Sequence, residues 1–170
     1  MIKRKRNGFT LTEVLITVAV TGIIFSVGPQ MFTQINRFVK ISQKRIEIQR
    51  EARVVLSTIN RNLRMATTSS IQIDRFAANQ PYCSRIAFQR IDGVKYQFYQ
   101  QGNRLIMVHT QAGRSARQIL TSSLKYMAFV PPRSEDLSMI SVSVTLEVQI
   151  TDAKTKALHM ASEKVMVMNE

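Results

Sequence analysis

The carboxylate of Glu13 is the side chain whose position most suggests chemistry. It is the only ionisable group among the twenty-four residues from Phe9 to Phe32. An isolated charge in lipid costs at least ~2.5–3.5 kcal/mol, so a carboxylate there needs a partner. No Lys, Arg or His occurs between Phe9 and Asn36. We therefore expect the cation that pairs with Glu13 to come from outside this segment.

The other reactive side chains do not form a recognisable site. His109 and His159 stand alone on expected strands, with no Cys or carboxylate at metal-ligand spacing, and Cys83 has no nearby His. The adjacent acids at positions 135 and 136 fall far short of the six to eight oxygens around calcium. Phosphate-binding glycine loops, serine elbows and paired catalytic carboxylates are missing from the sequence. The sequence therefore predicts no enzyme, no metal and no cofactor.

Basic and aromatic residues in the second half of the chain suggest one binding site. The formal net charge is +13, which favours polyanionic partners. Arginines that neutralise phosphates and tyrosines that stack on bases would suit DNA. The alternative is that these side chains are only solvated strand faces and a loop. The residues concerned are Lys95, Tyr96, Tyr99, Arg104, Arg114 and Arg117.

The apolar run around Glu13 is long enough to cross a membrane. A helix rises ~1.5 Å per residue and the hydrocarbon core is ~30 Å thick. The preceding basic residues, Lys3 to Arg6, place the amino end in the cytoplasm and the rest of the chain outside it. The length of the run and its carboxylate argue against a secretory signal peptide. A plain uncleaved single-span anchor remains an alternative.

The hexapeptide Gly8-Phe9-Thr10-Leu11-Thr12-Glu13, between a basic leader and an apolar helix, resembles the type IV prepilins and type II secretion pseudopilins. The resemblance implies that a prepilin peptidase cuts between Gly8 and Phe9 and methylates the new amine. It also implies that Glu13 pairs with the Phe9 amine of a neighbouring subunit. The implied partners are this peptidase, other pilin or pseudopilin subunits and an inner-membrane assembly platform. Thr12 departs from the pattern, which usually has an aliphatic residue there.

The helical pattern continues beyond the apolar run. Apolar residues at Leu56, Ile59, Leu63 and Ala66 share one face, and we expect one helix from about residue 9 to about residue 66. Pro29 is a place where this helix could bend. The run from 56 to 66, LSTINRNLRMA, resembles the helix end of J-type minor pseudopilins and PilW-type minor pilins, with asparagine replacing their usual acid at 62.

After residue 70 the hydrophobic period changes from 3.6 to 2, which indicates strands. Asp92-Gly93 predicts a hairpin turn, and apolar and polar residues alternate strictly from 140 to 150. We expect a loop from Thr110 to Gln118, because it is rich in Gly, Ser and Arg. The expected strands cover residues 85–90, 94–99, 104–109, 124–130, 140–150 and 158–168.

These patterns predict an α+β fold in which a long amino-terminal helix packs on an antiparallel β-sheet domain, and the resemblance to prepilins implies that this fold is pilin-like. The expected function is a minor pilin or pseudopilin that assembles into a filament, in its tip or initiation complex. A DNA-binding or adhesive minor pilin, or an unrelated anchored domain, remains an alternative. Before assembly the chain would lie in the bacterial inner membrane. The expected segments are a leader at 1–8, a transmembrane half-helix at 9–32, an amphipathic half-helix at 33–66 and a β domain at 67–170.

Overall fold

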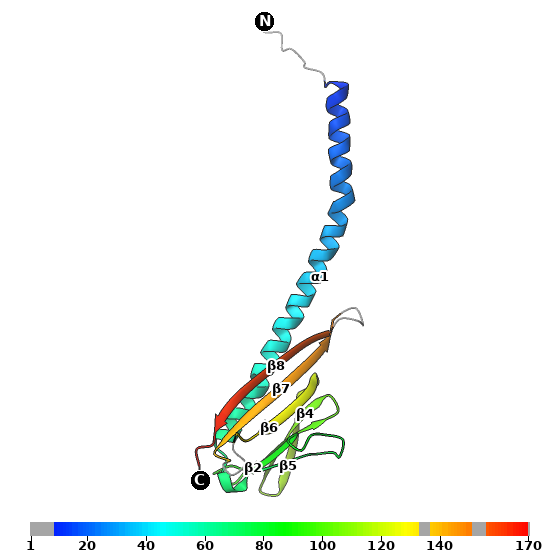
Figure 1. Cartoon of the computed structure of the whole chain (residues 1–170). Coiled ribbons are helices and arrows are strands. Elements are labelled where there is room, and N and C mark those ends of the chain that lie inside the picture. Colours follow the sequence, from blue (N-terminus) through cyan, green and yellow to red (C-terminus); the bar gives the residue numbers. More distant parts are fainter. Residues whose placement is uncertain (1–8, 133–136, 151–155, 170) are drawn as a thin grey trace. The chain divides into compact units, whose positions relative to one another are not determined.

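The computed structural model describes residues 9–132, 137–150 and 156–169. The chain divides into two compact units, Met1–Ser42 and Gln43–Glu170. The division falls inside helix α1, which runs from Leu11 to Arg64 and matches the single long helix that the sequence predicts. Figure 1 shows the order of the elements along the chain.

The first unit contains the amino-terminal part of α1. All of its large apolar side chains from Phe9 to Val39 are exposed. The helix is continuous through Pro29, although the proline ring removes one backbone hydrogen bond. Gly22 and Gly28 have open space where a side chain would be. This surface therefore has no covering element within the unit.

The second unit holds the rest of α1 and two antiparallel sheets. The five-stranded sheet has the order β1-β2-β3-β4-β5, and the three-stranded sheet has the order β6-β7-β8. A short 3-10 helix, η1 (Thr68–Ser70), separates α1 from the strands. The strands are β1 (Gln72–Asp74), β2 (Arg85–Gln89), β3 (Lys95–Gln101), β4 (Arg104–Gln111), β5 (Arg114–Thr121), β6 (Leu124–Val130), β7 (Met139–Gln149) and β8 (Lys156–Met166).

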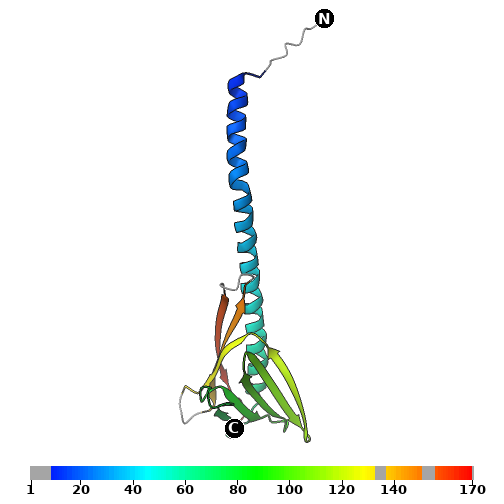
Figure 2. The same cartoon turned by 90° about the vertical axis from the view of Figure 1, so that its right-hand side faces the viewer.

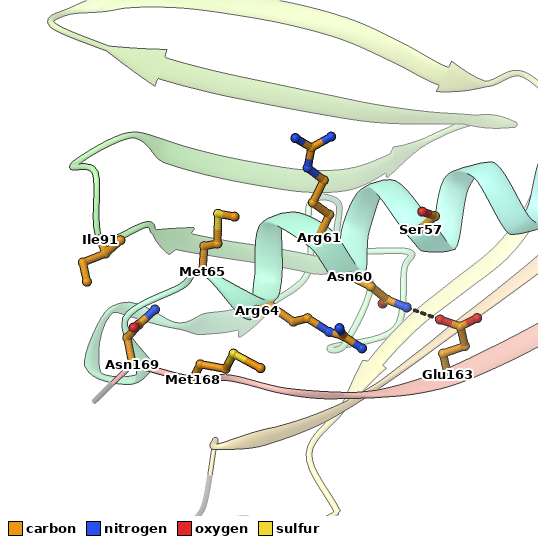
Figure 3. A pocket seen from close by; sticks show the side chains of 9 residues that line it. All are labelled: Ser57, Asn60, Arg61, Arg64, Met65, Ile91, Glu163, Met168 and Asn169. Atoms are coloured by element: carbon orange, nitrogen blue, oxygen red, sulfur yellow. Dashed lines mark hydrogen bonds between the residues drawn. The ribbon is translucent and has the colours of Figure 1, made fainter.

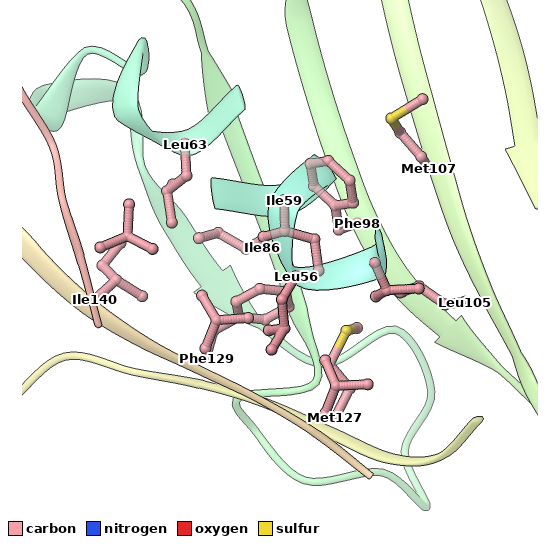
Figure 4. Close-up of a cluster of buried hydrophobic side chains, with 14 of the residues drawn as sticks. Leu56, Ile59, Leu63, Ile86, Phe98, Leu105, Met107, Met127, Phe129 and Ile140 are labelled. Carbon is pink, nitrogen blue, oxygen red and sulfur yellow. The ribbon is translucent and has the colours of Figure 1, made fainter. Parts of the chain in front are cut away.

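One face of the second half of α1 supplies the core to which both sheets contribute. Leu56, Ile59 and Leu63 are at most 2% exposed, which confirms the apolar face that the sequence predicts. They lie in one cluster with residues of the five-stranded sheet, such as Phe98, and of the three-stranded sheet, such as Phe129 (Figure 4). The turned view shows this part of the helix running along the strands (Figure 2). The helix therefore joins the two sheets into one folded unit.

The expected hairpins and the strictly alternating strand are confirmed. Gly93 and Gly102 have φ values of 81° and 60° in the turns between β2, β3 and β4, a backbone region that glycine adopts without strain. Along β7 the side chains from Ile140 to Leu146 are alternately buried and half-buried. Strand β8 pairs antiparallel with β7 over its whole length.

Two expectations about the β half are wrong. The segment Thr110 to Gln118 is not a loop, because β4 continues to Gln111 and β5 begins at Arg114. Ala112 (φ 48°) and Gly113 (φ 80°) form a two-residue turn with two positive φ angles, the geometry that suits the twist of a hairpin. The strands also form two sheets rather than one.

Residues near the carboxyl end close the end of α1. The Met168 N–H donates to the Arg64 carbonyl at 3.3 Å. The backbone N–H and the hydroxyl of Thr68 both donate to the Asn169 carbonyl, at 2.9 and 2.8 Å. This segment therefore satisfies one of the carbonyls that every helix leaves without a partner at its end.

Candidate assembly site

Glu13 takes part in a hydrogen-bonded helix cap. The Thr10 backbone N–H and the Thr10 hydroxyl both lie 3.2 Å from Glu13 Oε2, and the Glu13 N–H lies 3.3 Å from the Thr10 hydroxyl. This is a capping box, in which the residue before the helix and the third helical residue satisfy each other's backbone groups. The carboxylate also sits in the first turn, where the helix dipole stabilises negative charge.

The sequence analysis did not identify Thr10, although the spacing Thr-x-x-Glu indicates such a cap. The sequence between Phe9 and Asn36 contains no cation that could pair with Glu13. The structure supplies hydrogen-bond donors instead, both directed at one carboxylate oxygen, Oε2. The position of the Glu13 carboxylate is therefore fixed, while the described part of the chain still gives it no cation.

The helix that carries Glu13 can cross a membrane by its length and composition. Hydroxyl groups within it donate to carbonyls of the same helix, as polar groups in lipid must. Thr17 Oγ1 lies 2.9 Å from the Glu13 and Val14 carbonyls, and Ser26 Oγ lies 2.8 Å from the Ile23 carbonyl. Because these hydroxyl groups are hydrogen-bonded within the helix, the segment is suited to an apolar surrounding.

The expected cleavage site is only partly within the described residues. Phe9 precedes the helix and is 84% exposed. Gly8 lies outside the described residues. The roles of Gly8 and Phe9 in cleavage and methylation therefore stay predictions.

The rings of the two tyrosines in the expected polyanion site are each stacked on another side chain, and they do not lie side by side. Tyr96 packs against the core and stacks on His109, with ring centroids 5.9 Å apart. Tyr99 is buried and stacks on Phe76, with centroids 4.3 Å apart. Because they are three residues apart on one strand, the two rings lie on opposite faces of the sheet.

The four basic members of that expected site are exposed. Arg117 donates to the side-chain carbonyl of Gln101 at 2.5 Å. A site for single-stranded nucleic acid requires basic side chains close to an exposed aromatic ring on which a base can stack. Neither of the two tyrosines presents such a ring. The polyanion site stays a prediction with less support than the sequence suggested. Its basic residues are Lys95, Arg104, Arg114 and Arg117.

A groove of about 730 Å³ lies beside the last turns of α1 (Figure 3). On one side Asn60 donates a short hydrogen bond to the Glu163 carboxylate of β8. Arg61 and Arg64 leave the helix in different directions at this groove (Figure 3). The residues that line it are Ser57, Asn60, Arg61, Arg64, Met65, Ile91, Glu163, Met168 and Asn169.

Asn62, which replaces an acid in the run that resembles minor subunits, is engaged in hydrogen bonds. Its side-chain amide donates to the Thr58 carbonyl at 2.8 Å, and its side-chain carbonyl accepts from Arg90 Nη1 at 3.3 Å. Arg90 also forms an ion pair with Asp92 at 3.0 Å. An acid at position 62 would therefore meet the same guanidinium.

Comparison with known proteins gives two matches. Residues 3–28 match the family model described as the prokaryotic N-terminal methylation motif. A pilin-like protein, PilA3 of Thermus thermophilus, is 33% identical over 61 residues. Both matches support a type IV pilin or pseudopilin family for this chain. The match to PilA3 covers 36% of this chain and only 26% of the relative.

Two charged clusters lie on the surface of the sheets. Glu147 accepts hydrogen bonds from Lys156 at 2.5 Å and Lys125 at 3.0 Å, and these hold the pKa of Glu147 below its usual value. Arg85 makes two hydrogen bonds to Asp74, at 2.6 and 2.5 Å, which raise the pKa of Arg85. Both clusters are at least partly exposed.

Groups of metal-ligating side chains do not occur among the residues that the structure describes. His109 lies in the stack with Tyr96, and Cys83 is a free, half-buried thiol. The acids at 135 and 136 lie outside the described residues. Among the described residues, the helix surface with its capped carboxylate is the feature with the clearest functional chemistry.

Proposed function

We propose that this chain is a minor subunit of a type IV pilus-like or secretion pseudopilus filament. After cleavage between Gly8 and Phe9, the apolar part of α1 leaves the membrane and packs among the same segments of neighbouring subunits. The membrane-embedded form has its amino end in the cytoplasm and its β domain outside it. The partners are the prepilin peptidase, the other subunits and an inner-membrane assembly platform.

The observation that supports assembly most directly is the capped carboxylate at the start of an uncovered apolar helix. Thr10 holds one oxygen of Glu13, and both of its donors go to Oε2. The other oxygen, Oε1, remains available to a donor from another chain. The amine that cleavage creates on Phe9 is such a donor, and in an apolar surrounding it is drawn strongly to a carboxylate.

The minor position in the filament rests on two features of the second half of α1. The run 56–66 is similar to that of minor subunits, and its helix is confirmed as far as Arg64. Asn62 takes the place of the usual acid and keeps contact with a guanidinium, that of Arg90. A minor subunit near the tip contacts different neighbours rather than identical copies.

The experiment that tests the proposal is the substitution Glu13→Gln beside the native assembly machinery. We expect equal or higher levels in the membrane, because a charge is removed from lipid. Incorporation into filaments should fall, because the incoming amine then meets no anion. Membrane levels and sheared filaments are compared by immunoblot.

The matched control is Glu47→Gln, which removes the same charge from the exposed part of α1 in the second unit. It should leave incorporation as in the parent. Equal incorporation of the Glu13→Gln and parent chains would refute the proposal, because assembly would not need the carboxylate.

A further inference from the structure

We propose that the solvent-facing side of α1 in the second unit docks an acidic helix of a different subunit. The docking surface is an arginine stripe formed by Arg50, Arg53, Arg61 and Arg64, with Ser57 between the two pairs. The inference rests on the proposed function, since it names the kind of neighbour that the assembled subunit would contact.

The spacing of the stripe follows the helical period. Successive members from 50 to 64 are 3, 4, 4 and 3 residues apart, so their backbone positions lie along one face of the helix, from which the long side chains of Arg61 and Arg64 diverge (Figure 3). The stripe covers ~21 Å at ~1.5 Å per residue. This face lies away from the buried one that Leu56, Ile59 and Leu63 form. A second helix lying alongside presents side chains at the same repeat.

The side chains of the four arginines are exposed and have no hydrogen bond or ion pair within the described part of the chain. By contrast, Arg85 is paired with Asp74. Within the stripe, like charges stand three residues apart at 50 and 53 and again at 61 and 64, an arrangement that destabilises an isolated helix. An acidic partner would remove this repulsion.

The groove at the distal end of the stripe adds apolar contacts. Met65, Ile91 and Met168 line it together with Arg61 and Arg64 (Figure 3). Flexible methionine side chains adapt well to apolar surfaces of partner proteins. The groove thus suits a segment with both carboxylates and apolar side chains.

The partner is a chain other than a second copy of this one. Six of the seven carboxylates in the described residues already have a hydrogen-bond or ion-pair partner within the chain, and only Glu51 has none. The described part of the surface therefore offers few free acids to another copy of the chain. The engaged carboxylates are Glu13, Glu47, Asp74, Asp92, Glu147 and Glu163.

A helix explains the surface better than a nucleic acid does. Proteins that bind single strands combine basic groups with aromatic rings on which bases stack. The residues lining the groove include no aromatic side chain, and those of the stripe are arginines and a serine. Apolar contact beside the charges is instead typical of the centre of a protein interface.

The test uses the full chain in detergent micelles and a fluorescein-labelled helical peptide that carries four glutamates at the 3-4-4-3 repeat, flanked by leucines. A second peptide has the same composition with its glutamates scattered around the helix. The stripe variant is Arg50→Gln/Arg53→Gln/Arg61→Gln/Arg64→Gln. The control variant, Lys95→Gln/Arg104→Gln/Arg114→Gln/Arg117→Gln, changes the net charge equally. Binding is followed by fluorescence anisotropy.

We expect the stripe variant to bind the ordered peptide at least about tenfold more weakly than the parent, and the control variant within about threefold of it. The scattered peptide should bind the parent about tenfold more weakly than the ordered one. Equal losses in both variants, or equal binding of both peptides, would overturn the inference, because net charge alone would then explain the attraction.

A short DNA duplex is measured in the same way. If the duplex rather than the peptide loses affinity in the stripe variant alone, the stripe serves a nucleic acid and the inference is overturned. Glu13→Gln should bind the ordered peptide like the parent. Loss of filament incorporation in Glu13→Gln together with unchanged peptide binding in the stripe variant would overturn this inference and leave the proposed function intact.

Discussion

The substitution Leu63→Asp tests how the second unit is held together. Leu63 is 0% exposed and lies in the apolar cluster that includes Ile86 and Ile140 (Figure 4). Removing a buried leucine side chain costs ~2–5 kcal/mol. A carboxyl group buried without a partner costs a further ~1–3 kcal/mol. The expected loss of about 3–8 kcal/mol is comparable to the whole stability of a small domain, ~5–15 kcal/mol.

The matched control is Asn62→Asp, which introduces the same residue one position earlier. Its new carboxylate meets Arg90, whose Nη1 now lies 3.3 Å from the Asn62 side-chain carbonyl. We expect a change in unfolding free energy within about 1 kcal/mol, because the ion pair with Arg90 offsets the lost hydrogen bond from the Asn62 amide to the Thr58 carbonyl. The two variants therefore differ in the environment of the acid and not in its chemistry.

The assay is urea denaturation of the fragment 43–170, followed by tyrosine fluorescence, since the chain has four tyrosines and no tryptophan. The parent fragment should unfold in one cooperative transition, and Leu63→Asp should lower its midpoint strongly or abolish it. A Leu63→Asp fragment that unfolds at the parent's midpoint would refute the reasoning that α1 supplies the core of both sheets. So would a parent fragment without a cooperative transition.

Two further predictions concern the leader and the charged surface. Gly8→Val should leave the leader attached, whereas mass spectrometry of the mature parent should find a chain that begins at a methylated Phe9; any other first residue contradicts the cleavage assignment. Glu147 has a lowered pKa because Lys156 and Lys125 donate to it, so its contribution to stability is present above its unfolded-state pKa and is lost as the pH falls through the folded-state value. Glu147→Gln should therefore lower the urea midpoint at pH 7 and reduce the loss of stability on acidification to pH 3, and an unchanged pH profile would contradict this.

The sequence predicts correctly those elements in which the period of the apolar residues agrees with the observed burial pattern. The steps between Leu56, Ile59 and Leu63 predicted the buried face of α1, and the strict alternation from 140 to 150 predicted β7. The Asp-Gly pair predicted the β2–β3 turn because glycine adopts its positive φ without strain. At the assembly site, the isolation of Glu13 in an apolar run was enough to select it.

The features that the sequence did not predict depend on contacts with other segments, which the local residue pattern does not indicate. β5 has few apolar residues and most of its side chains are exposed, so its strand conformation comes from hydrogen bonding to β4. The partition of the strands into two sheets follows from how each packs on α1. The groove beside Arg61 and Arg64 joins the helix end to β8, about a hundred residues later, and no local spacing could have indicated it.

The closure of α1 by residues around Asn169 has a consequence for biogenesis. The helix emerges from the ribosome early. The hydrogen bonds from Met168 to Arg64 and from Thr68 to Asn169 can form only after about a hundred further residues have been synthesised. Contacts of such long range slow folding, because a large loop must close before they form. Until translocation passes residue 169, the apolar face of α1 lacks strand β8 and stays open to proteases and to premature association. The same closure fixes residue 169 beside the groove, so a label attached there would crowd the surface where a neighbouring subunit is expected to dock.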